Sequence, residues 1–302
     1  MQQSLTKSDF TSLSTWLRER IIALQHVLDR TTVALGSKAT SESVHGVRVA
    51  ARRLRALLHA FRRELDSRSV KQYQRELKSL THDLEAAREA DVTRGAIAQM
   101  TKDGNANIRM EAHALHERAA DGCLSALKRL RSRVAAAPWG RRLSALRRLS
   151  MRASLVTVND EPAATAIIRR GNGARRRLRR ALCRAGKNAE RLHRLRLKVK
   201  EVRYLLEVSG VKTPLAVQSE LKSLQHLQDC LGDMHDEEKL CESLRARRMP
   251  RRATRSLIEE LERRKHGRFK SFKRCRKHLM KRWRDLDGPS RGCATAVRRA
   301  AR

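Results

Sequence analysis

Histidine and arginine recur at helical spacing in one stretch of the chain. The positions follow one another at intervals of 3, 4, 3, 4 and 3 residues and are His45, Arg48, Arg52, Arg55, His59 and Arg62. At about 100° per residue they share one face of a helix, over a length of about 25 Å. That face carries no acid. Because the guanidinium group matches phosphate oxygens bidentately and His titrates near neutral pH, the spacing predicts a phosphate-binding surface.

A second stretch repeats this pattern. Its residues are His193, Arg196, Lys200 and Arg203, at an offset of 148 from the first set. Further along, a second match at an offset of 147 pairs Leu77, Leu80, Leu84 and Glu89 with Leu224, Leu227, Leu231 and Asp236. Two matches at nearly one offset indicate a duplicated unit of about half the chain.

The alternative interpretation of each basic row is an ordinary solvated helix face. Such faces usually mix acids and bases at i,i+4, whereas here like charges stack and oppose helix formation. This arrangement favours an anionic ligand. Proteins that bind single-stranded nucleic acids usually stack bases on aromatic side chains. Phe61 and Tyr204 fall toward the core side of their helices, so they are not available to stack on bases. The pattern therefore favours a surface that binds phosphate groups without contacting bases.

The elements that must position these rows are all predicted to be helices. Aromatic residues make up 3% of the chain and Gly and Pro are sparse, which disfavours β-sandwiches and barrels. Apolar stripes such as Val47, Leu54 and Leu58 predict amphipathic helices that pack as bundles. We expect helices over about 8–35 (capped by Ser8 or Asp9), 41–65 (capped by Ser41), 70–88, 91–100, 105–136, 141–152, 161–184, 188–208, 214–231, 236–247 and 250–283.

Charge and composition narrow the function. The 302 residues carry 69 Lys and Arg against 32 Asp and Glu, a net charge of +37, and both halves are basic. Such a chain is expected to work beside a polyanion. The sequence has no apolar run long enough to span a membrane and no secretory signal, so we expect a cytoplasmic protein without a membrane partner. The six scattered cysteines are expected to be free thiols.

The doubled motif resembles the CHAD family, the conserved histidine α-helical domain. Its signature H-x-x-R-x-x-x-(R/K)-x-x-R is present at His45 and again at His193, and the resemblance covers about residues 8–285. It implies a bacterial or archaeal cytoplasmic protein of two pseudo-symmetric four-helix-bundle repeats, which binds inorganic polyphosphate and associates with polyphosphate granules. The expected organisation is a first repeat at 8–152 that includes a bridging helix, a second at 160–285, and a mobile basic tail at 286–302.

By position, the resemblance assigns polyphosphate binding to His45, Arg48, Arg52, Arg55, Arg62, His193, Arg196, Lys200 and Arg203. Glu201 stands where the first copy has Arg53, which is expected to weaken that flank.

We expect no catalytic residue, cofactor or metal site. The rows lack the carboxylates that hold Mg²⁺ in phosphate-hydrolysing enzymes. Two groups could suggest a metal site, His113 with His116 and His235 with Asp233 and Asp236. We interpret these histidines as surface or capping residues. The alternatives are a basic protein that binds RNA or DNA non-specifically and, less favoured, a metal-dependent phosphohydrolase. The sequence does not define the oligomeric state.

Overall fold

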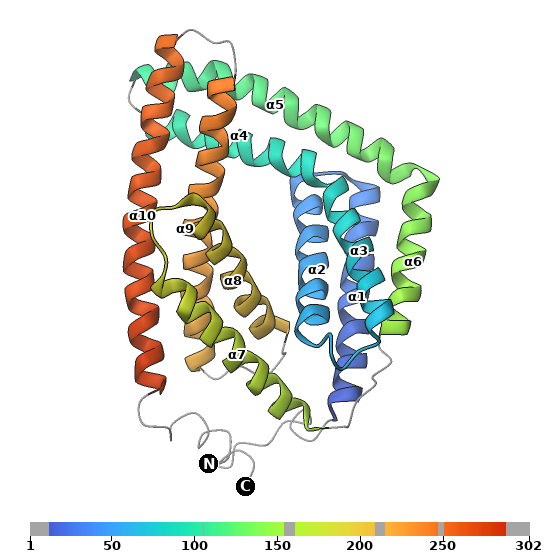
Figure 1. Cartoon of the computed structure of the whole chain (residues 1–302). Coiled ribbons are helices and arrows are strands. Elements are labelled where there is room, and N and C mark those ends of the chain that lie inside the picture. Colours follow the sequence, from blue (N-terminus) through green and yellow to red (C-terminus); the bar gives the residue numbers. More distant parts are fainter. Residues whose placement is uncertain (1–11, 105, 154–160, 209–214, 247–250, 288–302) are drawn as a thin grey trace. The chain divides into compact units, whose positions relative to one another are not determined.

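Leucine, alanine and arginine are strong helix formers, and the chain that they dominate folds into helices. The computed structural model describes residues 12–104, 106–153, 161–208, 215–246 and 251–287. Within these residues there is no strand beyond an isolated bridge between Ser12 and Pro162, so the expected all-α class is confirmed (Figure 1). The helices are α1 Leu13–Ser37, α2 Ser41–Ala60, α3 Ser67–Asp83, α4 Glu85–Asp103, α5 Ala106–Ala135, α6 Ala137–Ala153, α7 Ala163–Cys183, α8 Ala189–Val208, α9 Leu215–Ala246 and α10 Arg251–Asp287.

Side-chain caps fix where the first helices begin. Thr40, rather than the expected Ser41, caps α2, and its hydroxyl and that of Ser43 satisfy each other's backbone N–H groups in a capping box. Asp66 caps α3 by accepting the backbone N–H of Ser69 at 2.8 Å. The expected caps of the first helix, Ser8 and Asp9, lie outside the described residues.

Helix α2 is shorter than the sequence predicted. It ends at Ala60, and the chain turns through residues 61–64 instead of continuing to Leu65. Phe61 is the C-cap, with φ −112° and ψ 25°. The turn carries both Phe61 and Leu65 into the core, where they are fully or almost fully buried. Tertiary burial therefore ends the helix where local propensity would have extended it.

Helix α9 is continuous where the sequence predicted a break between residues 231 and 236. Gly232 lies inside the helix although glycine costs about 1 kcal/mol relative to alanine there. Leu227, Leu231 and Met234 are buried on either side of it. Their helical spacing makes burial continuous through the glycine, and this packing outweighs the weak local propensity.

The described residues form two compact units that are not contiguous in sequence. The α2 unit comprises those within 21–155 and 233–267, and the α8 unit those within 1–20, 156–232 and 268–302. The expected repeats at 8–152 and 160–285 differ from this division, because helices α1, α9 and α10 each pass from one unit into the other. Of the tail expected at 286–302, residues 286–287 belong to α10 and the remainder lies outside the described residues.

Apolar packing and hydrogen bonds explain why parts of α1, α9 and α10 belong to different units. In the α2 unit, Leu240, Leu244 and Leu257 join one apolar cluster with Ile97 and Met100 of α4. In the α8 unit, the start of α1 is held by backbone groups, because the Leu13 N–H donates to the Glu161 carbonyl at 2.9 Å. Arg20 Nε also donates to the Val208 carbonyl, at 2.6 Å.

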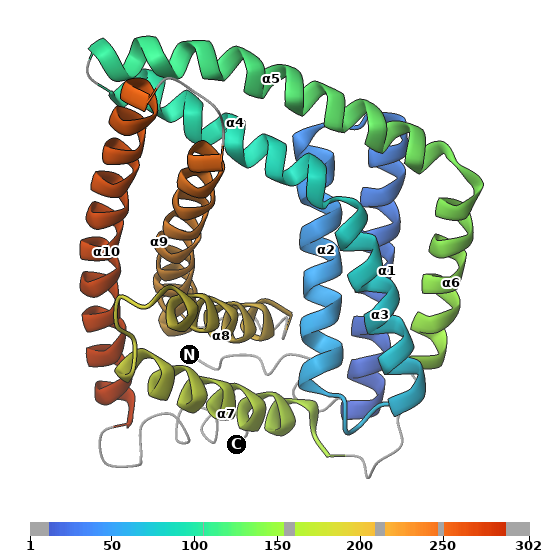
Figure 2. The same ribbon diagram turned by 45° about the horizontal axis from the view of Figure 1, so that its top comes forward.

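Each basic row lies on a helix that is supported by its own unit. In the α2 unit, α2 packs against α3 and α4, while α5 runs along α4 (Figures 1 and 2). In the α8 unit, α8 packs against α7. None of the helices in the described part of the chain is long and apolar enough to span a membrane.

Candidate anion-binding site

The basic row of α2 is graded from exposed to buried. Its apolar neighbours Val47 and Leu54 are completely buried, which fixes the orientation of the helix. His45 is exposed near the start of α2, and Arg52 and Arg55 are half-buried. Arg48 is only 7% exposed. The helical spacing therefore does bring these four residues onto one side, but it does not expose them equally.

Arg48 joins α2 to the two following helices. Its Nη1 atom donates to the Thr81 carbonyl at 3.1 Å and to Glu85 Oε2 at 3.1 Å. Burial lowers the pKa of Arg48, and the nearby charge of Arg52 lowers it further, while Glu85 opposes both effects. Arg48 thus links three helices through its hydrogen bonds, and it also contributes positive charge to the row.

Glu85 supplies an acidic partner to the basic row, which itself contains no acid. It accepts from Arg48 and also, at 3.3 Å, from Arg88 of α4. Burial opposes ionisation of Glu85, but the two guanidinium groups outweigh it and hold its pKa below the usual range. Arg88 in turn reaches Asp236 at 3.3 Å. Arg88 was not predicted to belong to the site, because a contact between α4 and α9 leaves no periodic pattern in the sequence.

Arg52 and Arg55 lie close enough in the α2 row for their charges to interact. Burial lowers the pKa of Arg55, and the charge of Arg52 lowers it further. Arg52 therefore repels both Arg48 and Arg55 in partly desolvated surroundings. A bound anion would relieve this repulsion.

Arg62 does not continue the helical row. It is exposed in the turn that follows α2, because the helix ends at Ala60. His59 lies in the last turn of α2 and is exposed. The predicted length of the row was therefore too great at this end.

The basic row of α8 ranges only from exposed to half-buried. His193 is exposed, whereas Arg196, Lys200 and Arg203 are half-buried. Arg203 Nε lies 3.4 Å from a Glu207 carboxylate oxygen, and its guanidinium carbon lies 4.7 Å from the centre of the Tyr204 ring. These contacts hold Arg203 against the helix surface.

The two rows differ in the residue that lies beside Arg48 in one and beside Arg196 in the other. At the offset of 147, Gly232 of α9 corresponds to Glu85, the acid that pairs with Arg48. Arg196, which corresponds to Arg48, indeed lies beside Gly232: a Cβ atom there would be 3.8 Å from Nη2 and 3.9 Å from Nε. The α8 row therefore has a glycine at the position where the α2 row has a carboxylate.

Glu201, expected to weaken the flank of the α8 row, is engaged by neighbouring bases. Its carboxylate accepts from Arg177 of α7 at 2.6 Å and from Lys198 at 3.1 Å. Burial opposes its ionisation, but these two partners hold its pKa below the usual range.

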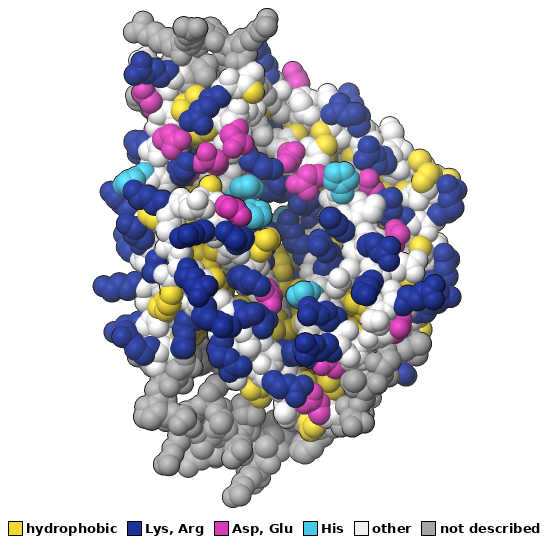
Figure 3. All heavy atoms as spheres, viewed as in Figure 1, with side chains coloured by type: hydrophobic (Ala, Val, Ile, Leu, Met, Phe, Trp, Pro, Cys, Tyr) yellow, Lys and Arg dark blue, Asp and Glu magenta, His cyan; other side chains and the backbone are white. Residues whose placement is uncertain are grey.

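Several arginines of α7 likewise pair with acids inside the α8 unit. Arg169 contacts Glu161 at 2.5 Å, and Arg175 contacts both oxygens of buried Glu220 at 2.7 Å. These arginines of α7 therefore stabilise the fold of the α8 unit. Figure 3 shows that Lys and Arg side chains nevertheless cover much of the surface on the face it displays.

Comparisons with known proteins agree with this architecture. PptA from Streptomyces chartreusis is 16% identical, with a TM-score of 0.67 over 91% of this chain and 100% of its own. The crystal structure of the CHAD domain from the plant Ricinus communis is 20% identical, with a TM-score of 0.66 over 99% of this chain and 94% of its own. No curated protein sequence matches. The CHAD domain family matches residues 22–245, and the chain therefore belongs to this family, for which polyphosphate binding is a known property.

Proposed function

We propose that this protein binds inorganic polyphosphate, without cleaving it, through the basic rows of α2 and α8. The observation that carries the proposal is the paired arrangement of partly buried bases. Arg52 and Arg55 crowd one row, and Lys200 and Arg203 occupy the equivalent positions in the other. Arg196 of that row lies beside Gly232. Membership of the CHAD family supports the choice of polyphosphate among anions.

The absence of exposed aromatic groups on these rows supports polyphosphate over nucleic acid. Phe61 is fully buried and Tyr204 is 4% exposed, so neither ring offers a free face to a base. The rows can satisfy phosphate oxygens with guanidinium and ammonium groups, which requires no nucleoside. A chain of phosphates without bases fits such a surface more closely than RNA does, because no base has to be left unstacked.

A binding role without catalysis is supported by how the neighbouring acids are used. Glu85 and Glu207 both contact row arginines, so neither is placed as a member of a carboxylate pair for Mg²⁺. We further propose that the protein is cytoplasmic and associates with polyphosphate granules, where its ligand would be concentrated.

Competition at physiological salt tests the proposal. The protein is bound to labelled long-chain polyphosphate, and single-stranded RNA with the same number of phosphates is titrated as competitor. We expect unlabelled polyphosphate to displace the label at a lower phosphate concentration than RNA does. Equal or stronger displacement by RNA would overturn the proposal in favour of non-specific nucleic-acid binding.

A further inference from the structure

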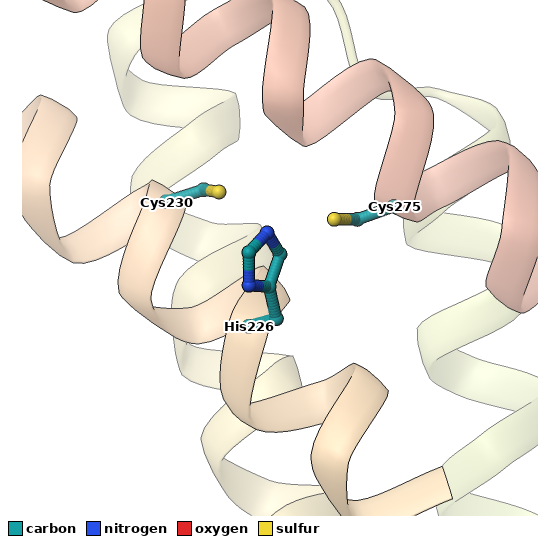
Figure 4. A group of neighbouring side chains, drawn as sticks. All are labelled: His226, Cys230 and Cys275. Carbon is teal, nitrogen blue, oxygen red and sulfur yellow. The ribbon is translucent and has the colours of Figure 1, made fainter. Parts of the chain in front are cut away.

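A second kind of site in the α8 unit is built from side chains that do not belong to the basic rows. The imidazole of His226 and the thiols of Cys230 and Cys275 point toward one another (Figure 4). One ligand atom from each of these residues lies within 4.8 Å of the other two. This cluster was not predicted from the sequence, because Cys275 is far from the other two residues along the chain.

Helix geometry explains why the three side chains converge. His226 and Cys230 are separated by four residues on α9, so they share one face of that helix. Cys275 comes from α10, which faces the same stretch of α9. Close to the site, Trp283 Nε1 of α10 donates to Glu220 of α9 at 3.1 Å. The partner helices are therefore held together by a contact that does not involve the ligands.

Glu220 makes this support rigid. It is 2% exposed and also accepts two hydrogen bonds from Arg175 of α7. One buried carboxylate thus fixes α7, α9 and α10 beside the cluster. A site whose backbone is already in place loses less conformational entropy when it binds a ligand.

The surroundings combine burial with access. Cys230 is 5% exposed and Cys275 is half-buried, whereas His226 is exposed at the edge of a pocket of about 470 Å³. Lys222 and Arg274 also line this pocket. A small ion can therefore enter beside His226 and reach the sulfur atoms of half-buried Cys275 and buried Cys230.

The donor set indicates the class of ion. Thiolate and imidazole ligands suit Zn²⁺ and other soft or borderline cations and do not suit Mg²⁺ or Ca²⁺. In a tetrahedral zinc site with bonds of about 2.0–2.3 Å, neighbouring ligand atoms lie about 3.5 Å apart. The separations here need only a small side-chain movement to reach that value. We propose that His226, Cys230 and Cys275 bind one Zn²⁺ ion, with water in the fourth position.

The local charge is compatible with a cation once the thiols ionise. Burial raises the pKa of the Cys275 thiol, although its hydrogen bond with Cys230 and the charge of Arg274 act in the opposite direction. Two thiolates and Zn²⁺ sum to zero, so the filled site does not repel Lys222 or Arg274. The histidines of the basic rows differ in this respect, because they have arginine neighbours and no thiolate. Binding should release protons.

Equilibrium zinc binding tests this inference on the full, reduced chain, without polyphosphate because polyphosphate itself chelates divalent cations. Zinc is titrated in competition with a chromophoric chelator, and Co²⁺ is used separately to detect thiolate-to-metal charge-transfer absorption. We expect one tight site per chain. Cys230→Ser and Cys275→Ser should each weaken zinc binding by more than about 100-fold, which exceeds the usual effect of losing a supporting residue. Each should lower the intensity of the cobalt band by at least half, because one of the two thiolates is lost.

Exposed Cys183 of α7 provides the matched control, because it belongs to the same unit but not to the cluster. Cys183→Ser should retain zinc affinity and the cobalt band. Circular dichroism of each variant confirms folding, and zinc should raise the melting temperature of the wild type and Cys183→Ser alone. Unchanged zinc binding in both cluster variants, or a wild-type Kd weaker than about 1 μM, would overturn the assignment. Neither result would bear on polyphosphate binding.

Discussion

Replacing Gly232 by Glu should give the α8 row the acid that the α2 row already has. A Cβ atom at this position would lie 3.8 Å from Arg196 Nη2, an ordinary van der Waals distance, so a β-carbon is accommodated without displacing its neighbours. Gly232 is inside α9, where any residue with a Cβ should add about 0.5–1 kcal/mol of helix stability. The substitution therefore changes charge without damaging the fold.

The expected loss of affinity follows from electrostatics. A new carboxylate beside Arg196 would lie about 7 Å from a phosphate bound to that arginine. Between effective dielectric constants of about 80 and 20, two unit charges at this distance repel by about 0.6–2.4 kcal/mol. Polyphosphate binding should thus weaken by about 10-fold, within a range of about 3- to 50-fold. Neutralising one contact should also flatten the plot of log K against log salt by about 0.7.

Gly232→Ala is the control, since it gains the same helix stability without charge. Both variants should melt at or above the wild-type temperature, and fluorescence titration with long-chain polyphosphate should show weakened binding in Gly232→Glu alone. Equal weakening in both variants would mean that the backbone at Gly232, not charge at Arg196, matters. Unchanged binding in Gly232→Glu would remove Arg196 from the site.

Three further outcomes are expected. Because Arg48 and Arg88 hold the pKa of Glu85 below its usual 4.5 against the effect of burial, the stability from this pair should be present above pH 4.5 and lost as pH falls through the folded-state pKa. Thermal melts should show a smaller acid-dependent loss in Glu85→Gln than in wild type, and an equal loss would contradict the assignment. Glu220→Gln should destabilise the protein by about 2–4 kcal/mol in urea unfolding because Glu220 is buried, whereas Glu259→Gln, in an exposed pair, should change stability by less than about 1 kcal/mol. Long-chain polyphosphate incubated with the pure protein and Mg²⁺ or Mn²⁺ should keep its length on gels, and phosphate release that a basic-row substitution abolishes would refute a purely binding role.

The helical class and the faces of the rows were predictable because both depend on short-range periodicity. Val47, Leu54 and Leu58 are all fully buried, as their spacing indicated. The same wheel placed Phe61 and Tyr204 toward the core, which is confirmed. A period of 3.6 residues can be recognised within a short stretch of sequence. The buried face of each helix could therefore be predicted without knowing which distant residues pack against it.

Features that depend on distant partners were not predictable. Arg48 was assigned only a binding role, but its contact with Glu85 crosses from α2 to α4. The unbroken α9 depends on packing around Gly232 that a local propensity argument could not weigh. The cluster that includes Cys275 likewise exists only because α9 and α10 lie side by side near Glu220.

The salt dependence of polyphosphate affinity tests most directly whether both rows bind the ligand. Two double variants are compared with wild type, Arg52→Ala with Arg55→Ala in α2, and Arg196→Ala with Lys200→Ala in α8. Each pair leaves the apolar stripe of its helix intact. If each removes two phosphate contacts, the slope of log K against log salt should flatten by about 1.4 in either double variant. An unchanged slope and affinity in either one would contradict the claim that both rows bind polyphosphate.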